Sequence, residues 1–260
     1  MTRSLQGSVV IVTAGTSGLG LCVAEKLIQA GASVIINYAN NEERAHDAFV
    51  HLNQLAAKAF SQDTGPRCVK IKADVTNKAG IQELVNQTVL AMGRIDAVVS
   101  NAGWTKFADF HDIDDNVDEE VWDRCYAANV KSHMFLCHAV KKYLEEAKGA
   151  FVMTASVAGV KPSGSSIAYS VTKAAQIHLA KTLATVMAPS IRVNSVSPSF
   201  METNWIANMP QSKIDDAREK TLLKQIANVE KKDVAEQIIL LIKSGSVTGS
   251  NVVIDAGFSI

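Results

Sequence analysis

The chain has 260 residues, and its 26 Lys and Arg balance 26 Asp and Glu, so the formal net charge at pH 7 is zero. Its composition, 47% hydrophobic and 20% charged, is typical of a soluble globular protein and excludes a fibre, a disordered chain and a miniature disulfide scaffold. A neutral chain lacks the broad basic field of nucleic-acid-binding proteins, so we expect no nucleic-acid partner. The apolar runs fall well short of the ~20 residues of a membrane span, and no secretory signal precedes the first of them, so we expect a cytoplasmic protein without a membrane partner.

The four cysteines have no spacing that would indicate a metal site or a disulfide framework. They are Cys22, Cys68, Cys125 and Cys137. Cys137 and His138, with His133 about one helical turn earlier, lie in an apolar stretch and are interpreted as packed helix residues, not as metal ligands. We therefore expect reduced thiols and no bound metal.

Short, apolar, β-branched runs alternate along the chain with longer segments of helical periodicity. The predicted strands are 8–13, 33–37, 68–73, 96–100, 150–155, 191–196 and 251–255. The predicted helical segments are 18–30, 41–60, 77–92, 118–147, 166–188 and 231–243. This alternation is typical of βαβ units, and continuous apolar strands are typical of a sheet covered on both faces. The sequence therefore predicts one α/β domain over residues 1–260, with a Rossmann-type, doubly wound, parallel seven-stranded sheet and helices on both faces.

Two segments interrupt the alternation of strands and helices. Residues 103–120 are acidic with interspersed aromatic side chains, and residues 198–229 contain Met and Trp. Both follow predicted strands, and open α/β sheets bind ligands at the carboxyl ends of their strands. We expect these segments to form the substrate site; the alternative is that both are variable surface loops. Their Trp104, Phe200 and Trp205 favour a bulky, apolar substrate.

A glycine-rich turn directly follows the first predicted strand and opens a helix. It runs from Thr13 to Gly20, and its candidate binding residues are Gly15, Thr16, Ser17, Gly18, Leu19 and Gly20. Glycines allow a tight turn and let the backbone approach a pyrophosphate, which backbone N–H groups and the helix dipole then hold. These residues are predicted to bind the phosphates of a dinucleotide.

The turn resembles the TGxxxGxG motif of the classical short-chain dehydrogenase/reductase family, and the resemblance covers nearly the whole chain. Gly18 and Gly20 match the motif, whereas Ala14 stands in place of its first glycine. The segment NYANNEE after the second predicted strand is similar to that of 3-oxoacyl carrier-protein reductases in this family. The resemblance implies a Rossmann-type fold, a nicotinamide cofactor, and the interconversion of ketones and secondary alcohols.

Other motifs of the family occur in the expected order. Asp74 and Val75 follow the third predicted strand and resemble the pair that contacts the adenine ring. The residues NAG at 101–103 follow the fourth predicted strand and match the family's NAG motif near the nicotinamide ribose. A third resembles NxVxPG, with Ser199 in place of the glycine, and precedes the threonine that contacts the nicotinamide carboxamide. The resemblance thereby implies that the cofactor is also bound by Asp74, Val75, Asn101, Ala102, Gly103, Pro198 and Thr203, together with Tyr169 and Lys173.

The end of the second predicted strand indicates which nicotinamide cofactor is used. An acidic side chain there accepts hydrogen bonds from the adenosine ribose and repels a 2′-phosphate. The residues here are Asn37, Tyr38, Ala39 and Asn40, and no acid occurs before Glu42. We therefore expect these residues to bind NADP, or NADPH in the reduced form, in preference to NAD. Ser17 takes the place of the arginine found in many NADP-dependent relatives, so we expect neutral hydrogen bonds to hold the phosphate.

Tyr169 and Lys173 are spaced to project from one face of a predicted helix. Reduction of a carbonyl requires an acid that protonates the developing alkoxide, and oxidation of an alcohol requires the corresponding base. A free tyrosine has a pKa of about 10, and a neighbouring cation lowers that value. We expect Tyr169 to be the general acid/base and Lys173 to lower its pKa.

Two further residues complete a catalytic set by resemblance to the family. Ser156 precedes Tyr169 by the family's spacing, and its hydroxyl is implied to hold the substrate oxygen. Asn129 is implied to anchor a water that links Lys173 to a proton relay. The predicted function is NADP(H)-dependent reduction of a small-molecule ketone, or oxidation of a secondary alcohol, by hydride transfer. The resemblance also implies a homotetramer or homodimer.

The sequence leaves two other functions open. A non-catalytic NADP(H)-binding sensor or scaffold would keep the same fold, and the lost motif glycines at Ala14 and Ser199 are compatible with it. The four intact catalytic positions argue against this alternative, since a sensor has no evident need for a proton relay. An enoyl reductase is disfavoured because that group spaces its Tyr and Lys more widely than they are spaced here.

Overall fold

The computed structural model describes residues 3–60, 67–201, 211–224 and 229–260. The strands in these segments are β1 (Val9–Val12), β2 (Ser33–Tyr38), β3 (Cys68–Lys72), β4 (Ala97–Ser100), β5 (Ala150–Thr154), β6 (Arg192–Pro198) and β7 (Asn251–Ile254). The α-helices are α1 (Gly18–Gln29), α2 (Glu42–Ala59), α3 (Lys78–Met92), α4 (Glu119–Tyr126), α5 (Ser132–Ala147), α6 (Ile167–Val186), α7 (Gln211–Lys220) and α8 (Lys231–Lys243). Within these four segments, no helix combines the length and apolar character needed to cross a membrane.

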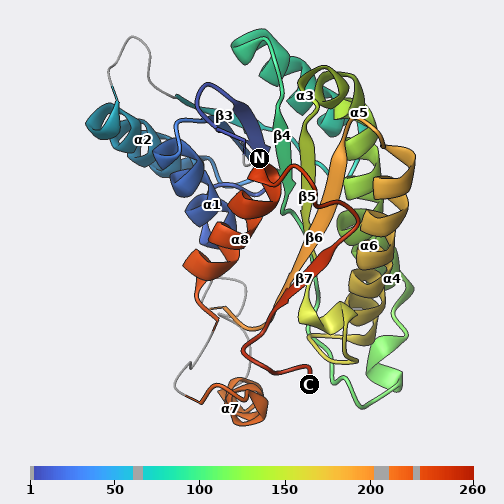
Figure 1. Cartoon of the computed structure of the whole chain (residues 1–260). Helices are drawn as coiled ribbons and strands as arrows, with labels where there is room; N and C mark the ends of the chain where they lie inside the picture. The colour runs from blue at the N-terminus through green and yellow to red at the C-terminus, as the bar shows by residue number, and fades with distance from the viewer. Residues whose placement is uncertain (1–2, 61–66, 202–210, 225–228) are drawn as a thin grey trace.

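The strands form one parallel seven-stranded sheet in the order β3-β2-β1-β4-β5-β6-β7, so the predicted doubly wound, Rossmann-type fold is confirmed. β1 pairs with β2 on one side, where Val12 lies beside Ile36, and with β4 on the other, where Val12 lies beside Val99. The connections after β1 and β4 therefore diverge and leave a crevice at the carboxyl ends of the strands. In Figure 1, this end of the sheet is the one near α7 and the C-terminus.

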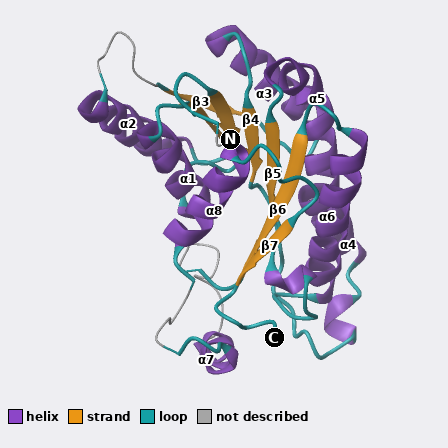
Figure 2. Cartoon of the chain, in the orientation of Figure 1, coloured by secondary structure: helices purple, strands orange, loops and turns teal. Residues whose placement is uncertain are grey.

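Helices cover both faces of the sheet, as Figure 2 shows. Alternate residues of β1 point to opposite faces: Val10 and Val12 pack in a cluster with α1, α2 and α8, and Val9 and Ile11 pack in a cluster with α3, α5 and α6. The strands are apolar on both sides for this reason, which explains their continuous apolar sequences. Each such buried side chain stabilises the fold by about 1.5–3 kcal/mol.

Side-chain caps mark the start of several predicted helices. Asn41 Oδ1 accepts a hydrogen bond from Arg44 N (2.8 Å) at the start of α2, and Ser166 Oγ accepts one from Tyr169 N (3.2 Å) at the start of α6. Each cap satisfies one of the N–H groups that a first helical turn leaves without a backbone partner. At α1, the residue in the capping position, Ser17, makes no such side-chain hydrogen bond.

The structure corrects two expectations about element boundaries. The segment predicted as one helix over 118–147 is divided into α4 and α5 by a π-helical turn, η2 (Ala127–Lys131). The predicted substrate loop over 198–229 contains the helix α7. The α7 sequence, QSKIDDAREK, has no apolar face at helical spacing, so hydrophobic periodicity does not predict it.

The turn between β1 and α1 is strained at Ala14. This residue has a φ of 49°, in the left-handed region that costs a side chain with a Cβ about 1–2 kcal/mol. Gly20 lies so close to the turn that an added Cβ would be 2.3 Å from Ala14 O. The missing motif glycine at Ala14 therefore adds strain to a turn whose later glycine is required for close packing.

Candidate active site

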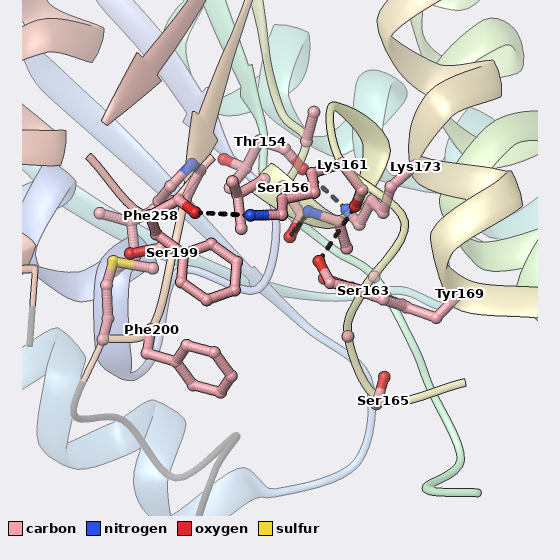
Figure 3. A pocket seen from close by; sticks show the side chains of 18 of the residues that line it. Thr154, Ser156, Lys161, Ser163, Ser165, Tyr169, Lys173, Ser199, Phe200 and Phe258 are labelled. Carbon is pink, nitrogen blue, oxygen red and sulfur yellow. Dashed lines mark hydrogen bonds between the residues drawn. The ribbon is translucent and has the colours of Figure 1, made fainter. Parts of the chain in front are cut away.

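A cavity of about 480 Å³ lies at the carboxyl ends of the strands (Figure 3). Among the predicted site residues, it is lined by Ser17, Gly18, Leu19, Asn101, Gly103, Ser156, Tyr169, Lys173, Pro198 and Phe200. Figure 3 shows Tyr169 and Lys173 on one side of the cavity and Phe200 and Phe258 on the other. The fold thus brings predicted catalytic residues and predicted cofactor residues to one site.

Ser156 is brought to Tyr169 by a short turn that packs directly on α6. This turn, η3 (Val157–Gly159), begins after Ser156, whose Oγ accepts a hydrogen bond at 3.1 Å from the backbone N–H two residues on. Gly159 touches the α6 backbone so closely that an added Cβ would be 2.5 Å from the carbonyl carbon of Lys173. The Ser156 and Tyr169 side chains are hydrogen-bonded. Ser156 therefore both caps a turn and contacts the phenol.

Burial dominates the titration of Tyr169 in the protein alone. It raises the pKa of the phenol to about 12, and the hydrogen bond with Ser156 acts in the opposite direction. In the protein alone the pKa therefore lies above its ordinary value, because desolvation of the phenolate dominates, and the lowering by Lys173 stays a prediction. At neutral pH the phenol keeps its proton and is a potential proton donor.

Lys173 is only 4% exposed although it carries an amine. Its Nζ donates hydrogen bonds to Thr154 O and Gln176 Oε1, both at 2.9 Å, and lies 5.6 Å from the centre of the Tyr169 ring. Burial lowers the pKa of Lys173 to about 7. The amine and ammonium forms therefore coexist near neutral pH.

Asn129 is fully buried in the π-helical turn and ties the loop after β4 to α6. Its Oδ1 accepts a hydrogen bond from Trp104 N at 2.8 Å. Its Nδ2 donates to Trp104 O at 2.9 Å and to Thr172 Oγ1 at 3.1 Å. Since Thr172 is the neighbour of Lys173, this amide helps to hold the lysine's part of α6 in place. π-Helical turns are frequent at functional sites.

Trp104 does not form the substrate wall predicted for it. The described residues that line the cavity do not include Trp104. The guanidinium carbon of Arg124 lies 4.2 Å from the centre of the Trp104 ring, so the indole packs against α4. The paired backbone hydrogen bonds with Asn129 hold Trp104 in this position.

Thr13 joins the two strand ends that border the crevice. Its fully buried Oγ1 accepts hydrogen bonds from Asn101 N at 2.8 Å and Ala102 N at 2.9 Å. Asn101 Nδ2 in turn donates to Thr13 O at 3.2 Å. The NAG segment, residues 101–103, is thereby held against the glycine-rich turn. Thr13 was missing from the predicted site, although it is the first residue of the glycine motif.

The first turn of α1 fits the pyrophosphate of a dinucleotide. Ser17 makes no side-chain cap, and Ser17, Gly18 and Leu19 line the cavity. Backbone N–H groups at a helix start, together with the helix dipole, attract phosphate oxygens. Gly20 lets the helix approach the turn, because a Cβ there would collide with Ala14 O. Both the donors and the steric cradle suit the predicted cofactor.

Two side chains at the end of β2 have partners within the protein. Asn37 is buried, and its Nδ2 donates to Ala73 O at 2.9 Å, which joins β2 to the chain after β3. The Tyr38 hydroxyl donates to a carboxylate of α2. The side chains of Asn37 and Tyr38 are thus engaged within the protein, and the cofactor contact expected of these two residues stays a prediction. The other predicted residues of this segment, Ala39 and Asn40, are exposed.

The negative charge of Glu42, the first acid after β2, is balanced by a cation. Its carboxylate is paired with Lys70 and accepts the hydrogen bond from Tyr38. These two bonds lower the pKa of Glu42. The carboxylate therefore stays ionised but is engaged with neighbouring side chains.

Arg44 is a potential cofactor-binding residue that the sequence analysis missed. Its Nε donates to Thr16 Oγ1 at 3.4 Å, so the guanidinium lies beside the glycine-rich turn. The family motif places a phosphate-binding arginine only at the position of Ser17. The available signal was the cap at Asn41, which places Arg44 in the first turn of α2.

The remaining predicted cofactor residues are only partly described. Asp74 Oδ1 accepts hydrogen bonds from Thr76 N at 2.9 Å and Thr76 Oγ1 at 2.7 Å, and Val75 is buried. Thr203 and Trp205 lie outside the described residues. No group of three His, Cys, Asp or Glu side chains within the described segments is arranged to hold a metal.

Comparison with known proteins agrees with the motifs. The family model described as "Enoyl-(Acyl carrier protein) reductase" matches residues 13–259. The chain belongs to the classical short-chain dehydrogenase/reductase family. The short-chain dehydrogenase/reductase SDRA of Arabidopsis thaliana is 32% identical over 259 residues, which cover 99% of this chain and 96% of that protein. Tropinone reductase-like 3 of Erythroxylum coca is 30% identical over 260 residues, which cover 98% of this chain and 94% of that protein.

Solved structures of this short-chain dehydrogenase/reductase family share the fold. A short-chain dehydrogenase from Burkholderia cenocepacia J2315 in complex with NADP superposes with a TM-score of 0.87 at 26% identity, covering 99% of this chain and 100% of that one. The protein is accordingly a short-chain dehydrogenase/reductase, an oxidoreductase that acts on alcohol or ketone substrates.

The buried Lys173 makes stability depend on pH. Its pKa is about 7 in the folded chain, against an ordinary value of 10.5. Between these values the unfolded chain binds more protons than the folded chain, so a rise in pH stabilises the folded state. The wild type is compared with Lys173→Met from pH 7 to pH 9; above this range ordinary thiols ionise and add their own pH dependence. Over this range we expect the free energy of unfolding of the wild type to rise relative to that of Lys173→Met, by up to ~1.4 kcal/mol per pH unit. Urea unfolding at several pH values measures this difference, and parallel pH dependences would contradict it.

Proposed function

We propose that the protein is an NADP(H)-dependent oxidoreductase that reduces a ketone, or oxidises a secondary alcohol, by hydride transfer. The observation that carries the proposal is the meeting of Ser156, Tyr169 and Lys173 on the cavity that also contains the first turn of α1. When bound, the nicotinamide cofactor donates or accepts the hydride. The protein's own groups bind and orient the reactants and move the proton.

Tyr169 is the general acid/base in this proposal. Its buried, protonated phenol gives a proton to the developing alkoxide in reduction and takes it back in oxidation. Ser156 holds the substrate oxygen beside the phenol, to which its own side chain is bonded. When Lys173 carries its charge, it favours the phenolate that forms as the proton leaves. Asn129 anchors a water that links Lys173 to a proton relay, and its bond to Thr172 holds it beside the lysine's part of α6.

The charges around Thr16 support NADP over NAD. The carboxylate of Glu42 is paired with Lys70, and Arg44 lies at the glycine-rich turn. Arginine gives charge-assisted hydrogen bonds that match the geometry of a phosphate. The Burkholderia relative, whose structure is a complex with NADP, supports the same choice.

The far wall of the cavity supports a bulky, apolar substrate. The rings of Phe200 and Phe258 pack edge to face, with centres 6.3 Å apart and an interplanar angle of 79°. Both line the cavity. We also propose that the enzyme is cytoplasmic and forms a homotetramer or homodimer; the oligomeric state rests on the family resemblance.

The alternatives are less well supported. A non-catalytic sensor or scaffold gives no reason for a buried phenol bonded to Ser156 beside a buried lysine. An enoyl reductase, the activity in the description of the matching family model, is disfavoured because Tyr169 and Lys173 are one helical turn apart.

Tyr169→Phe tests the proposed chemistry. Loss of the phenolic proton should lower turnover of a carbonyl substrate by about 10³-fold, the typical contribution of a general acid, while NADPH affinity stays nearly unchanged. Turnover is followed by the absorbance of the reduced cofactor and affinity by its fluorescence. Tyr143→Phe, a matched change on α5, should keep full activity. Full activity of Tyr169→Phe would refute the proposed role.

Arg44→Gln tests the proposed cofactor preference. Removal of one charge-assisted hydrogen bond should raise the Kd for NADPH by about 10-fold or more and leave the Kd for NADH unchanged. Fluorescence titration with both cofactors measures the two values. Lys58→Gln removes the same charge near the end of α2 and serves as the control. An equal effect of Arg44→Gln on both cofactors would count against a phosphate contact.

A further inference from the structure

A line of buried hydrogen bonds begins at Lys173 and leads into the core. Gln176 Oε1 accepts from Lys173 Nζ at 2.9 Å, and Gln176 Nε2 lies 3.0 Å from His133 Nε2. His133 Nδ1 lies 2.6 Å from Ser100 Oγ. None of the four side chains is more than 4% exposed. The line therefore connects the lysine of α6 to α5 and to the end of β4.

The chemistry of the groups determines the direction of these hydrogen bonds. Thr154 O only accepts, so the Gln176 atom 3.1 Å from it is the amide nitrogen, and Gln176 Oε1 faces Lys173. The second N–H of the amide then points to His133 Nε2, which must accept. The ring proton of His133 therefore lies on Nδ1 and is donated to Ser100 Oγ. Every hydrogen-bonding group of the Gln176 amide is used.

The titratable neighbours of Lys173 are neutral at neutral pH. Burial, aided by the lysine charge, lowers the pKa of His133 to about 3. Burial raises the pKa of Cys125 on α4 to about 11 and that of Tyr169 to about 12. Among these groups no carboxylate balances the ammonium. The charge is instead stabilised by two oriented carbonyl dipoles, those of Thr154 and Gln176.

The same two carbonyls constrain the orientation of the ammonium. Its three N–H donors are arranged tetrahedrally, so two fixed directions determine the third. Thr154 O and Gln176 Oε1 accept two of them. Lys173 also lines the cavity, next to Tyr169. The third donor is thus left for a group in the cavity.

We propose that Gln176, oriented by His133, is a positioning residue for Lys173: it stabilises the ammonium form and directs the remaining N–H into the cavity. This inference rests on the proposed function, in which Lys173 acts on Tyr169 and on the cofactor. Gln176 acts through the lysine and does not line the cavity described above.

The test follows the titration of Lys173 by NMR, in protein labelled with carbon-13 at the lysine ε-carbons. The Lys173 resonance is the one absent from Lys173→Met. Gln176→Met removes the carbonyl acceptor at similar size, so the titration midpoint of Lys173 should fall by about one pH unit. Gln176→Glu supplies a carboxylate, so the midpoint should rise. His133→Leu should move it in the same direction as Gln176→Met, by less.

Gln87→Met, on the exposed face of α3, is the matched control and should leave the midpoint unchanged. Equal midpoints in the wild type, Gln176→Met and Gln176→Glu would overturn the positioning role. If Gln176→Met does not fold, the direction of the shift in Gln176→Glu decides the matter. The readout needs neither cofactor nor substrate, so its result is separate from the proposed function. Full turnover by Tyr169→Phe would refute the function and leave this titration unaffected.

Discussion

The buried amine of Lys173 is the constraint on which the rest of the site depends. A charge that is 4% exposed is costly unless hydrogen-bond acceptors surround it. Two carbonyl oxygens at 2.9 Å meet this need, one at the end of β5 and one on α6 itself. This arrangement requires α6 to lie close to the end of the sheet. Gly159 allows that approach, and the same turn carries Ser156 to the phenol of Tyr169.

Local groups provide for an anionic ligand although the chain has no net charge. The first turn of α1 lacks a side-chain cap and faces the cavity. Thr13 holds the NAG segment against this turn through bonds to two backbone N–H groups. The guanidinium of Arg44 lies at the side of the same turn. Uncapped amides and a nearby cation are groups that attract phosphate locally, which is compatible with a surface that is not globally basic.

The sequence predicted the features that depend on local pattern or on motif spacing. Apolar runs predicted each strand, and motif order predicted that Ser156, Tyr169 and Lys173 belong to one site. The helix α7 escaped prediction because its sequence, with Ile214 and Ala217 as its two apolar residues, is too polar for hydrophobic periodicity to reveal it. The orientation of Trp104 depends on its pairing with Asn129, and the use of the Asn37 amide depends on the chain after β3. The pKa of Tyr169 depends on burial, which neighbours in the sequence do not reveal.

The most direct test of the central claim is cofactor titration followed by a turnover assay. NADPH and NADH are titrated by fluorescence, and a panel of ketones that includes bulky apolar members is then offered with the preferred cofactor while its absorbance is recorded. The account predicts tighter binding of NADPH than of NADH and oxidation of NADPH by at least one ketone. Absence of binding by either cofactor would contradict it.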